Sequence, residues 1–361
     1  MNSPQEFRRL FAAANRLRAS DAAGALATIV RTAGSTYRRP GTSMLVGADG
    51  SVTCPLAGGC PQHDLVLRAR RTIEADVPEI ARYDRDAGFD VLLEAGCGGE
   101  LEVLIEPLSR DQDFAFLDAI ATLHERRARG FMATIFCRNG TVLSPRPQRL
   151  LAGDGVAWQD IGDPSLCERV AEIGGDLRGE RAAARRLAVG RASMEVLFES
   201  LRPVHRLVIF GANEGAVALA RVAASLGWSC VVADPSPDRA ADAMDGVDVV
   251  AATPETIRRS IAFDRDTSVA AMTHNLERDV RLLQALAGVP LAYLGVIGSR
   301  ERVALIRARL PVAMDLHAPA GLDIGSETPE EIALAVAAEI IACSHARTAG
   351  SLAASALPIH P

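Results

Sequence analysis

The chain has 361 residues, which is more than one hydrophobic core usually fills, so two domains are expected. A composition with 48% hydrophobic and 23% charged residues is typical of a globular protein and excludes a disordered or collagen-like chain. The net charge of -6, without blocks of like charge, leaves no basic surface for a phosphate backbone and excludes nucleic acid as a partner.

All 39 basic residues are arginines, which excludes Schiff-base chemistry, a pyridoxal phosphate anchor and a P-loop lysine. Residues 1–18 contain no continuous apolar segment, and the apolar residues 332–343 are too few to span a bilayer. The 7 cysteines are an odd number without a CxxC pair, as in reduced thiols. We therefore expect a cytoplasmic protein without a signal peptide, membrane anchor, disulfide framework or structural zinc.

The first half of the chain predicts a mixed α/β domain. Ser3 and Glu6 form a capping box before a first amphipathic helix. Short β-prone runs follow at residues 26–31, 44–46 and 91–93. Residues 113–129 are predicted as a helix, and residues 131–143 as a hairpin around Asn139 and Gly140.

Residues 176–191 are rich in Arg and Ala and lack strong apolar periodicity, so a domain boundary is placed near residue 200. The expected domains are residues 1–200, residues 201–345 and a tail, 346–361. In the second domain, strands are predicted at 206–210, 230–233, 247–251, 268–272 and 292–297, and helices at 215–226 and after the capping box of Thr328 and Glu331. This alternation predicts an α/β fold, with a Rossmann-like parallel-sheet domain after the amino-terminal mixed domain.

The turn after the first of these strands matches a dinucleotide fingerprint only in part. Gly211 is in place, but Asn213 stands where a second glycine lets the backbone approach a pyrophosphate, and Ala216 takes the third position. Asp234, at the end of the next strand, is placed to accept from a ribose hydroxyl. Nucleotide or phosphate binding and a purely structural turn both stay open.

Three later loops are each interpreted as following a predicted strand, so we expect them at the same carboxyl edge of the sheet. Gly298, Ser299 and Arg300 are predicted to hold an anion with helix N-terminal amides and a guanidinium. His274 is either a proton donor or cofactor contact, or a polar structural residue. Asp323 either contacts the cofactor or braces the loop before the last helix.

Two cysteines lie among glycines, in the segments Gly59-Cys60 and Cys97-Gly98. Glycine neighbours let a large ligand approach closely and leave the sulfur reachable, as suits a thiolate that touches a metal centre or carries sulfane sulfur. The alternative is that each is an inert, buried small hydrophobe. The other five are interpreted as packing residues: Cys54, Cys137, Cys167, Cys230 and Cys343.

In the order and spacing of its motifs, the chain resembles the XdhC/CoxI family of xanthine dehydrogenase accessory factors. The motifs are residues 34–41, 44–46, 58–60 and 96–107 in the first half, and 210–212, 272–274, 295–300 and 321–333 in the second. The chain departs from the family pattern at Pro61 to Asp64, and at Asn213-Glu214, where the family usually has a Gly-Ala-Gly-His turn.

The resemblance implies a protein that binds molybdenum cofactor (molybdopterin) and protects it while sulfur from a cysteine desulfurase is installed. It also implies delivery to an apo molybdenum hydroxylase of the xanthine dehydrogenase type, a chaperone role more than that of a turnover enzyme. Cys60 and Cys97 are then the expected contacts to the metal. A homodimer is an open alternative for the oligomeric state.

Two other function classes are weighed against this one. An NAD(P)-dependent oxidoreductase would fit the alternation of strands and helices and the position of Asp234, but Asn213 and the absence of lysine disfavour it. A regulatory ligand-binding or scaffold module would leave the two glycine-flanked cysteines unexplained.

Overall fold

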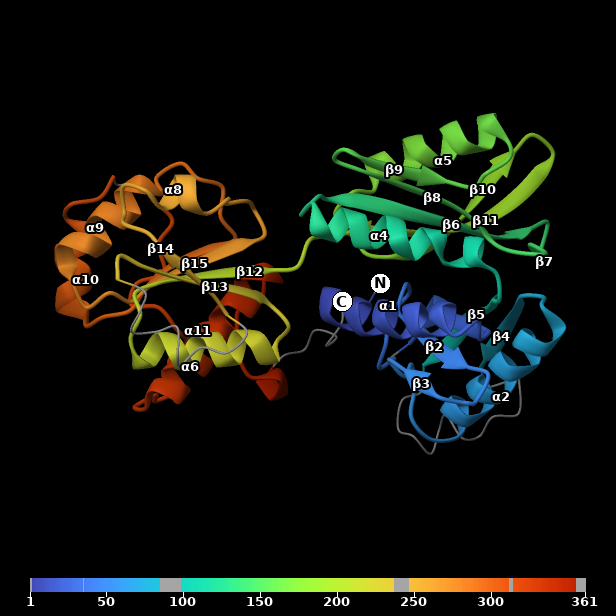
Figure 1. Cartoon of the computed structure of the whole chain (residues 1–361), viewed down its shortest axis with the longest axis horizontal. Helices are drawn as coiled ribbons and strands as arrows, with labels where there is room; N and C mark the ends of the chain where they lie inside the picture. Colours follow the sequence, from blue (N-terminus) through green and yellow to red (C-terminus); the bar gives the residue numbers. More distant parts are fainter. Residues whose placement is uncertain (1, 35, 85–98, 237–246, 312–313, 355–361) are drawn as a thin grey trace. The chain divides into compact units, whose positions relative to one another are not determined.

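The computed structural model describes residues 2–34, 36–84, 99–236, 247–311 and 314–354 (Figure 1). The chain divides into two compact units, Met1–Pro203 and Val204–Pro361. Within the described ranges, no helix is both long enough and apolar enough to cross a membrane.

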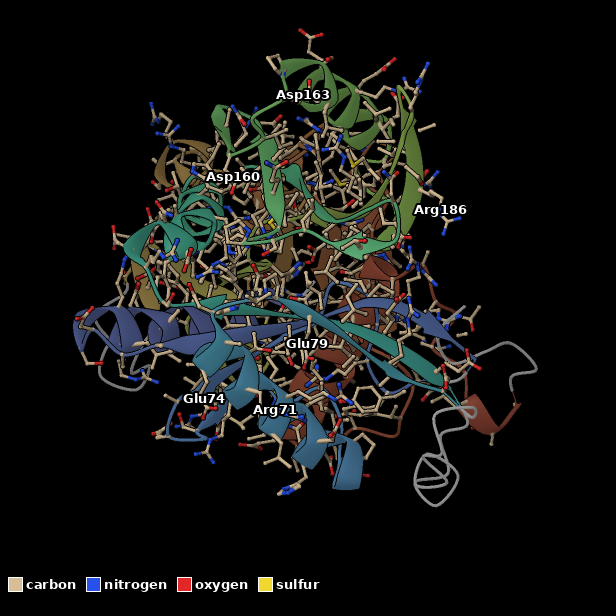
Figure 2. The ribbon with its side chains drawn as sticks, turned by 90° about the vertical axis from the view of Figure 1, so that its right-hand side faces the viewer. Arg71, Glu74, Glu79, Asp160, Asp163 and Arg186 are labelled. Carbon is tan, nitrogen blue, oxygen red and sulfur yellow. The ribbon has the colours of Figure 1, made fainter. Side chains whose placement is uncertain are left out.

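The amino-terminal unit begins with α1 (Pro4–Ala19), whose Ser3–Glu6 capping box is formed as predicted. An antiparallel sheet in the order β3-β2-β1-β5-β4 follows. Its strands are β1 (Gly24–Ala33), β2 (Ser43–Gly47), β3 (Val52–Thr53), β4 (Glu79–Tyr83) and β5 (Glu100–Leu108). Helix α2 (Gly59–Ala75) buries Leu65 and Ala69 on this sheet and exposes Arg71 and Glu74 to solvent (Figure 2).

A second antiparallel sheet of the same unit has the order β10-β11-β6-β8-β9, with β7 paired to β6. Its strands are β6 (Gly130–Arg138), β7 (Thr141–Val142), β8 (Gln148–Gly153), β9 (Val156–Gln159), β10 (Ala183–Val189) and β11 (Ala192–Leu201). Its helices are η2 (Asp111–Phe114), α4 (Ala115–Glu125) and α5 (Pro164–Asp176). Apolar residues of α1, α4 and both sheets form one core, which makes the two sheets parts of a single unit.

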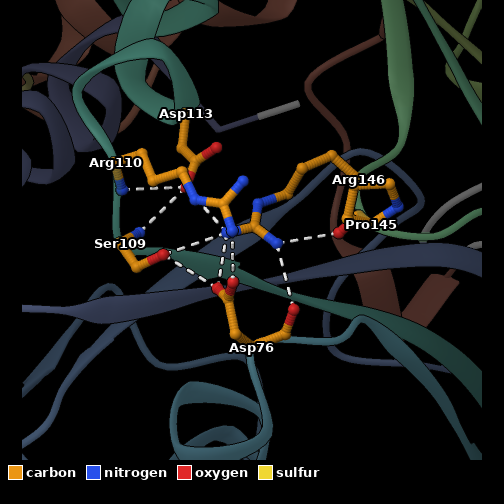
Figure 3. Close-up of polar contacts among 6 residues, drawn as sticks. All are labelled: Asp76, Ser109, Arg110, Asp113, Pro145 and Arg146. Carbon is orange, nitrogen blue, oxygen red and sulfur yellow. Dashed lines mark hydrogen bonds and ion pairs between the residues drawn. The ribbon is translucent and has the colours of Figure 1, made fainter.

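Two arginines join the end of α2 to the turn after β5 (Figure 3). Arg110 and Arg146 both donate to Asp76, the residue that ends α2 in the left-handed region, at 2.8 and 2.6 Å. Arg146 also donates to the buried carboxylate of Asp113 at 2.9 Å, and Asp113 accepts from the backbone N–H of Ser109. Charge-assisted bonds of this kind fix the position of α2 and hence of the turn at its start.

The hairpin around Asn139 and Gly140 is confirmed, since both residues have positive φ and β6 pairs with β7. The sequence pattern predicts no strand in residues 176–191, but β10 lies there. β10 is an edge strand with exposed arginines, so one side of it needs no apolar residues, and the apolar pattern that signals a strand is weak. The run at 91–93 lies outside the described residues.

The second unit contains a parallel sheet in the order β14-β13-β12-β15-β16, which confirms the predicted Rossmann-like fold. Its strands are β12 (Arg206–Phe210), β13 (Ser229–Asp234), β14 (Asp248–Ala251), β15 (Thr267–Ala271) and β16 (Tyr293–Val296). Its helices are α6 (Glu214–Ser225), α8 (Ile257–Ser260), α9 (Leu276–Ala285), α10 (Arg300–Arg307), α11 (Pro329–Ser344) and η3 (Leu352–Ala354). Helices α6 and α11 pack on one face of the sheet and α8 to α10 on the other, and the capping box of Thr328 and Glu331 starts α11 as predicted.

Candidate cofactor site

The strand order makes the carboxyl ends of β12 and β15 the topological switch point, where open α/β sheets bind ligands. Gly211, directly after β12, has a φ of 115°, and a Cβ there would lie 2.8 Å from the carbonyl oxygen of Met272. Only glycine fits this position. The structure thus brings together the turns after β12 and β15, which the sequence predicted for the same edge.

Asn213 occupies the start of α6. Its Oδ1 accepts from the N–H of Ala216 at 3.0 Å, and its Nδ2 donates to the carbonyl oxygen of Met272. The side chain therefore caps the helix and fills the turn in which a fingerprint glycine leaves room for a pyrophosphate.

Asp234 ends β13 beside the same turn. One carboxylate oxygen accepts from the N–H of Ala212 at 3.2 Å and the other from the N–H of Ser236 at 2.8 Å. Both oxygens are therefore engaged by the backbone of the protein, whereas dinucleotide binding would use this carboxylate for a ribose.

The turn after β16 leads into α10, which carries Arg302 to a partner on α9. Ser299 is the N-cap of α10 and accepts from the N–H of Arg302, while Arg300 is exposed at the first position of the helix. Arg302 forms an ion pair of 2.6 Å with Asp279, whose side chain is fully buried. A Cβ at Gly298 would lie 2.7 Å from Cδ of Arg302, so this glycine makes room for the arginine.

The pair of Asp279 and Arg302 also reaches the turn after β15. Thr273 donates its hydroxyl to Asp279 at 2.6 Å, so one buried carboxylate joins two of the loops at the carboxyl edge. Nε of Arg302 is buried and has no hydrogen-bond partner among the residues that the structure describes. Sequence reasoning missed both residues, although Asp279 lies at helical spacing with Leu282, Leu283 and Leu286, where an apolar residue is the norm.

The two remaining predicted residues of this edge are exposed. His274 has a φ of 54°, in the left-handed region, and follows Thr273 in the turn between β15 and α9. Asp323 lies in the loop before α11. Both are accessible to a ligand.

The cysteine segment of the amino-terminal unit forms the start of α2. Gly58 is the N-cap and provides no side-chain hydrogen bond, and Gly59 has a φ of 63° with open space where a Cβ would be. An open groove beside this turn is lined by Val52, Pro55, Gly59, Gln62, His63 and Val66. Cys97, Gly98 and the side chain of Cys60 lie outside the described residues.

The structure also accounts for other cysteines. Cys54, Cys137 and Cys230 are buried, in agreement with the prediction that they pack in the cores, whereas Cys167 and Cys343 are half-buried. No three His, Cys, Asp or Glu side chains in the described part of the chain are arranged to hold a metal ion.

Residues 207–340 match the XdhC Rossmann domain, and residues 17–84 match the XdhC and CoxI family. The chain belongs to the XdhC and CoxI family. The resemblance found in the sequence motifs is thereby confirmed. The first match spans the carboxyl edge described above, from β12 into α11, and the second includes the turn that starts α2.

Three proteins similar to this chain extend over most of its length. A Bacillus subtilis (strain 168) protein named as a probable xanthine dehydrogenase component is 27% identical over 88% of this chain and 92% of its own length. The molybdenum cofactor insertion chaperone PaoD of Escherichia coli (strain K12) is 24% identical over 87% of this chain and 81% of its own. A Bacillus halodurans protein whose crystal structure is named as a xanthine dehydrogenase superposes with a TM-score of 0.75 at 26% identity, over 96% of this chain and 98% of that one.

Proposed function

We propose that this chain binds molybdenum cofactor, supports its sulfuration, and inserts it into a molybdenum hydroxylase of the xanthine dehydrogenase type. The similarity to the insertion chaperone PaoD, which extends over most of both chains, carries the proposal. The partners are then the apo hydroxylase, as acceptor of the cofactor, and a cysteine desulfurase, as the source of sulfur. The bound cofactor is cargo for the client enzyme.

The carboxyl edge of the Rossmann unit has chemistry that suits the phosphate of such a cofactor. Arg300 is exposed at the start of α10, where helix N-terminal amides also favour anions. Nε of Arg302 is a buried donor without a partner among the described residues, beside the Gly298 turn. We assign the anionic group of the cofactor to this edge, with His274 and Asp323 as accessible polar neighbours.

The start of α2, in the amino-terminal unit, suits a contact to a molybdenum centre. Gly58 and Gly59 have open space where a Cβ would be, so a large ligand can approach the backbone beside Cys60. A thiolate is a soft ligand that binds molybdenum or carries sulfur. We assign these roles to Cys60 and Cys97.

The alternative function, an NAD(P)-dependent oxidoreductase, is disfavoured by two observations. Asn213 fills the turn that the pyrophosphate needs, and both carboxylate oxygens of Asp234 accept from backbone N–H groups. A dinucleotide would have to displace both sets of bonds.

The test is metal, pterin and nucleotide analysis of protein purified from a molybdenum-sufficient host. We expect molybdenum with a pterin chromophore and expect Arg300→Ala to lower both, while Arg221→Ala, at an exposed position on α6, leaves them unchanged. Tightly bound NAD(P) without molybdenum would instead support the oxidoreductase.

A further inference from the structure

A cysteine, a histidine and a glutamate of the Rossmann unit are joined by two consecutive contacts. Cys343 Sγ is 3.8 Å from Nε2 of His317, and Nδ1 of His317 is 3.2 Å from Oε1 of Glu339. Glu339 and Cys343 are one turn apart on α11, while His317 lies beside β16, bridged to Gly295. Nucleophile, base and carboxylate in this order form the arrangement that activates thiols in enzymes.

The glutamate is held so that it orients the imidazole. Its Oε2 accepts from the hydroxyl of Tyr293 at 2.6 Å and from the N–H of Gly321 at 2.8 Å, which leaves Oε1 for His317. The ring of Tyr293 stacks on that of His317 with the centroids 4.4 Å apart. Because a carboxylate only accepts, Nδ1 of His317 is the donor, and in the neutral imidazole the lone pair of Nε2 then faces the sulfur.

The thiol is partly exposed and needs a base. Cys343 and His317 are both half-buried at the surface of the unit. Burial, with the negative charges of Glu339 and Asp315, raises the pKa of the Cys343 thiol, so the sulfur is protonated at neutral pH. A proton acceptor at Nε2 is what such a thiol requires in order to attack.

A pocket of about 430 Å³ opens beside the histidine, and its volume is in the range of small-molecule sites. Tyr293, Met314, Asp315 and His317 are among its lining residues. A small reagent, or the cysteine loop of a donor protein, can therefore approach His317.

We propose that Cys343 is a sulfur-accepting residue whose thiol is deprotonated by His317 and attacks the sulfane sulfur of a persulfide donor. This inference rests on the proposed function, in which sulfur must pass from a donor to the cofactor. It adds a role to the sequence-based interpretation of Cys343 as a packing residue, since Cys343 does pack against the apolar cluster of α6 and α11.

The step balances without an oxidant. Nε2 of His317 takes the proton from Sγ of Cys343, and Sγ attacks the terminal sulfur of a donor R–S–SH. The new S–S bond gives Cys343–S–SH, the S–S bond of the donor breaks, and its electron pair leaves on R–S⁻, which takes the proton back from His317. The sulfane sulfur moves without a change of oxidation state, and Glu339 acts as a positioning residue.

The experiment treats the full-length protein, without cofactor, with glutathione persulfide and follows the addition of one sulfur atom to each cysteine by peptide mass spectrometry. Cys167 is the internal control, because like Cys343 it is half-buried and packs against an apolar cluster, so the contact of Cys343 with His317 is the difference under test. We expect Cys343 to react at least about tenfold faster than Cys167. His317→Gln removes the general base and should slow Cys343 by about tenfold or more, to a rate near that of Cys167.

Glu339→Gln separates positioning from folding. Without the carboxylate the imidazole is no longer oriented toward the sulfur, so the reaction should slow at Cys343 and stay unchanged at Cys167 in the same variant, with the melting temperature monitored in parallel. Equal rates at Cys343 and Cys167 in the wild-type protein, or an unchanged rate in folded His317→Gln, would overturn the proposal. Since no cofactor is present in this experiment, that result leaves the proposed function standing. A wild-type protein that forms the Cys343 persulfide normally but binds no molybdenum cofactor would count against the proposed function alone.

Discussion

Nδ2 of Asn213 donates a hydrogen bond to the carbonyl oxygen of Met272, and this bond joins the turn after β12 to the turn after β15. The same side chain caps α6 through Ala216. A dinucleotide-binding Rossmann domain keeps this position open for a pyrophosphate. In this chain the side chain of Asn213 occupies that position in the turn after β12.

The first prediction concerns nucleotide binding. Wild-type protein should bind NAD(H) more weakly than micromolar, because Asn213 occupies the approach of the pyrophosphate. Asn213→Gly should strengthen any residual binding and lower the free energy of unfolding by about 1 kcal/mol, since the bond to Met272 is lost. Titration calorimetry and thermal unfolding measure the two effects, and micromolar affinity in the wild type would contradict the account.

The second prediction separates two neighbouring arginines. Arg302→Ala leaves the buried Asp279 without its cation and should lower the free energy of unfolding by roughly 3 kcal/mol. Arg300→Ala removes only an exposed side chain, so stability should change by less than about 0.5 kcal/mol. Denaturant unfolding measures both.

The third prediction concerns Arg300 and the retention of the cofactor. If Arg300 binds an anionic group of the cofactor, Arg300→Ala should weaken retention by about one to two decades, the value of one charge-assisted contact. Equilibrium dialysis with molybdenum analysis provides the comparison. Unchanged retention in the folded variant would remove Arg300 from the site.

The fourth prediction concerns the glycine-flanked cysteines. Cys60→Ser and Cys97→Ser should change stability little while activation of an apo molybdenum hydroxylase falls sharply, because serine preserves volume but is neither a soft ligand nor a sulfur carrier. Cys230→Ser is the control: its side chain is 8% exposed, so the new hydroxyl should cost roughly 1 to 3 kcal/mol without a specific maturation defect. Normal cofactor content and activation in both folded variants would disprove the assignment.

The fifth prediction is a pH dependence of stability. Burial, with a smaller effect of Arg8, lowers the pKa of His124 to about 4, and both ring nitrogens lack a hydrogen-bond partner among the described residues. The unfolded chain therefore binds a proton at higher pH than the folded one, and stability should fall as the pH drops from about 6.5 to 4, by at most about 3 kcal/mol.

His124→Met is the matched variant for this effect, because methionine fills the site without titrating. Urea unfolding at several pH values should show a flatter profile for the variant between pH 6.5 and 4. The same slope in both proteins would assign the effect to other groups.

Local patterns predicted much of the fold. The capping boxes at Ser3 and Thr328 and the hairpin at Asn139-Gly140 depend on neighbouring residues alone, and the structure contains all three. β10 was missed because an edge strand with one exposed side carries little apolar pattern. Strand propensity depends on the local sequence, whereas β10 is held as a strand by its pairing with β11.

The polar groups of the sites were harder to predict. Gly211 and Asn213 were identified from a fingerprint that is local in sequence. The ion pair of Asp279 and Arg302, and the line from Cys343 through His317 to Glu339, join different elements. Only Glu339 and Cys343, one turn apart on α11, have a spacing that predicts their proximity; the other partners are brought together by the fold.

The central claim is tested most directly by following molybdenum from this protein to a client. Protein loaded with molybdenum cofactor is mixed with an apo hydroxylase of the xanthine dehydrogenase type, the two are separated by size, and molybdenum and hydroxylase activity are measured in each fraction. The account predicts that molybdenum leaves the loaded protein and that the client gains metal and activity in proportion, faster than with free cofactor. Molybdenum that stays with this protein, or a client activated no faster than by free cofactor, would contradict it.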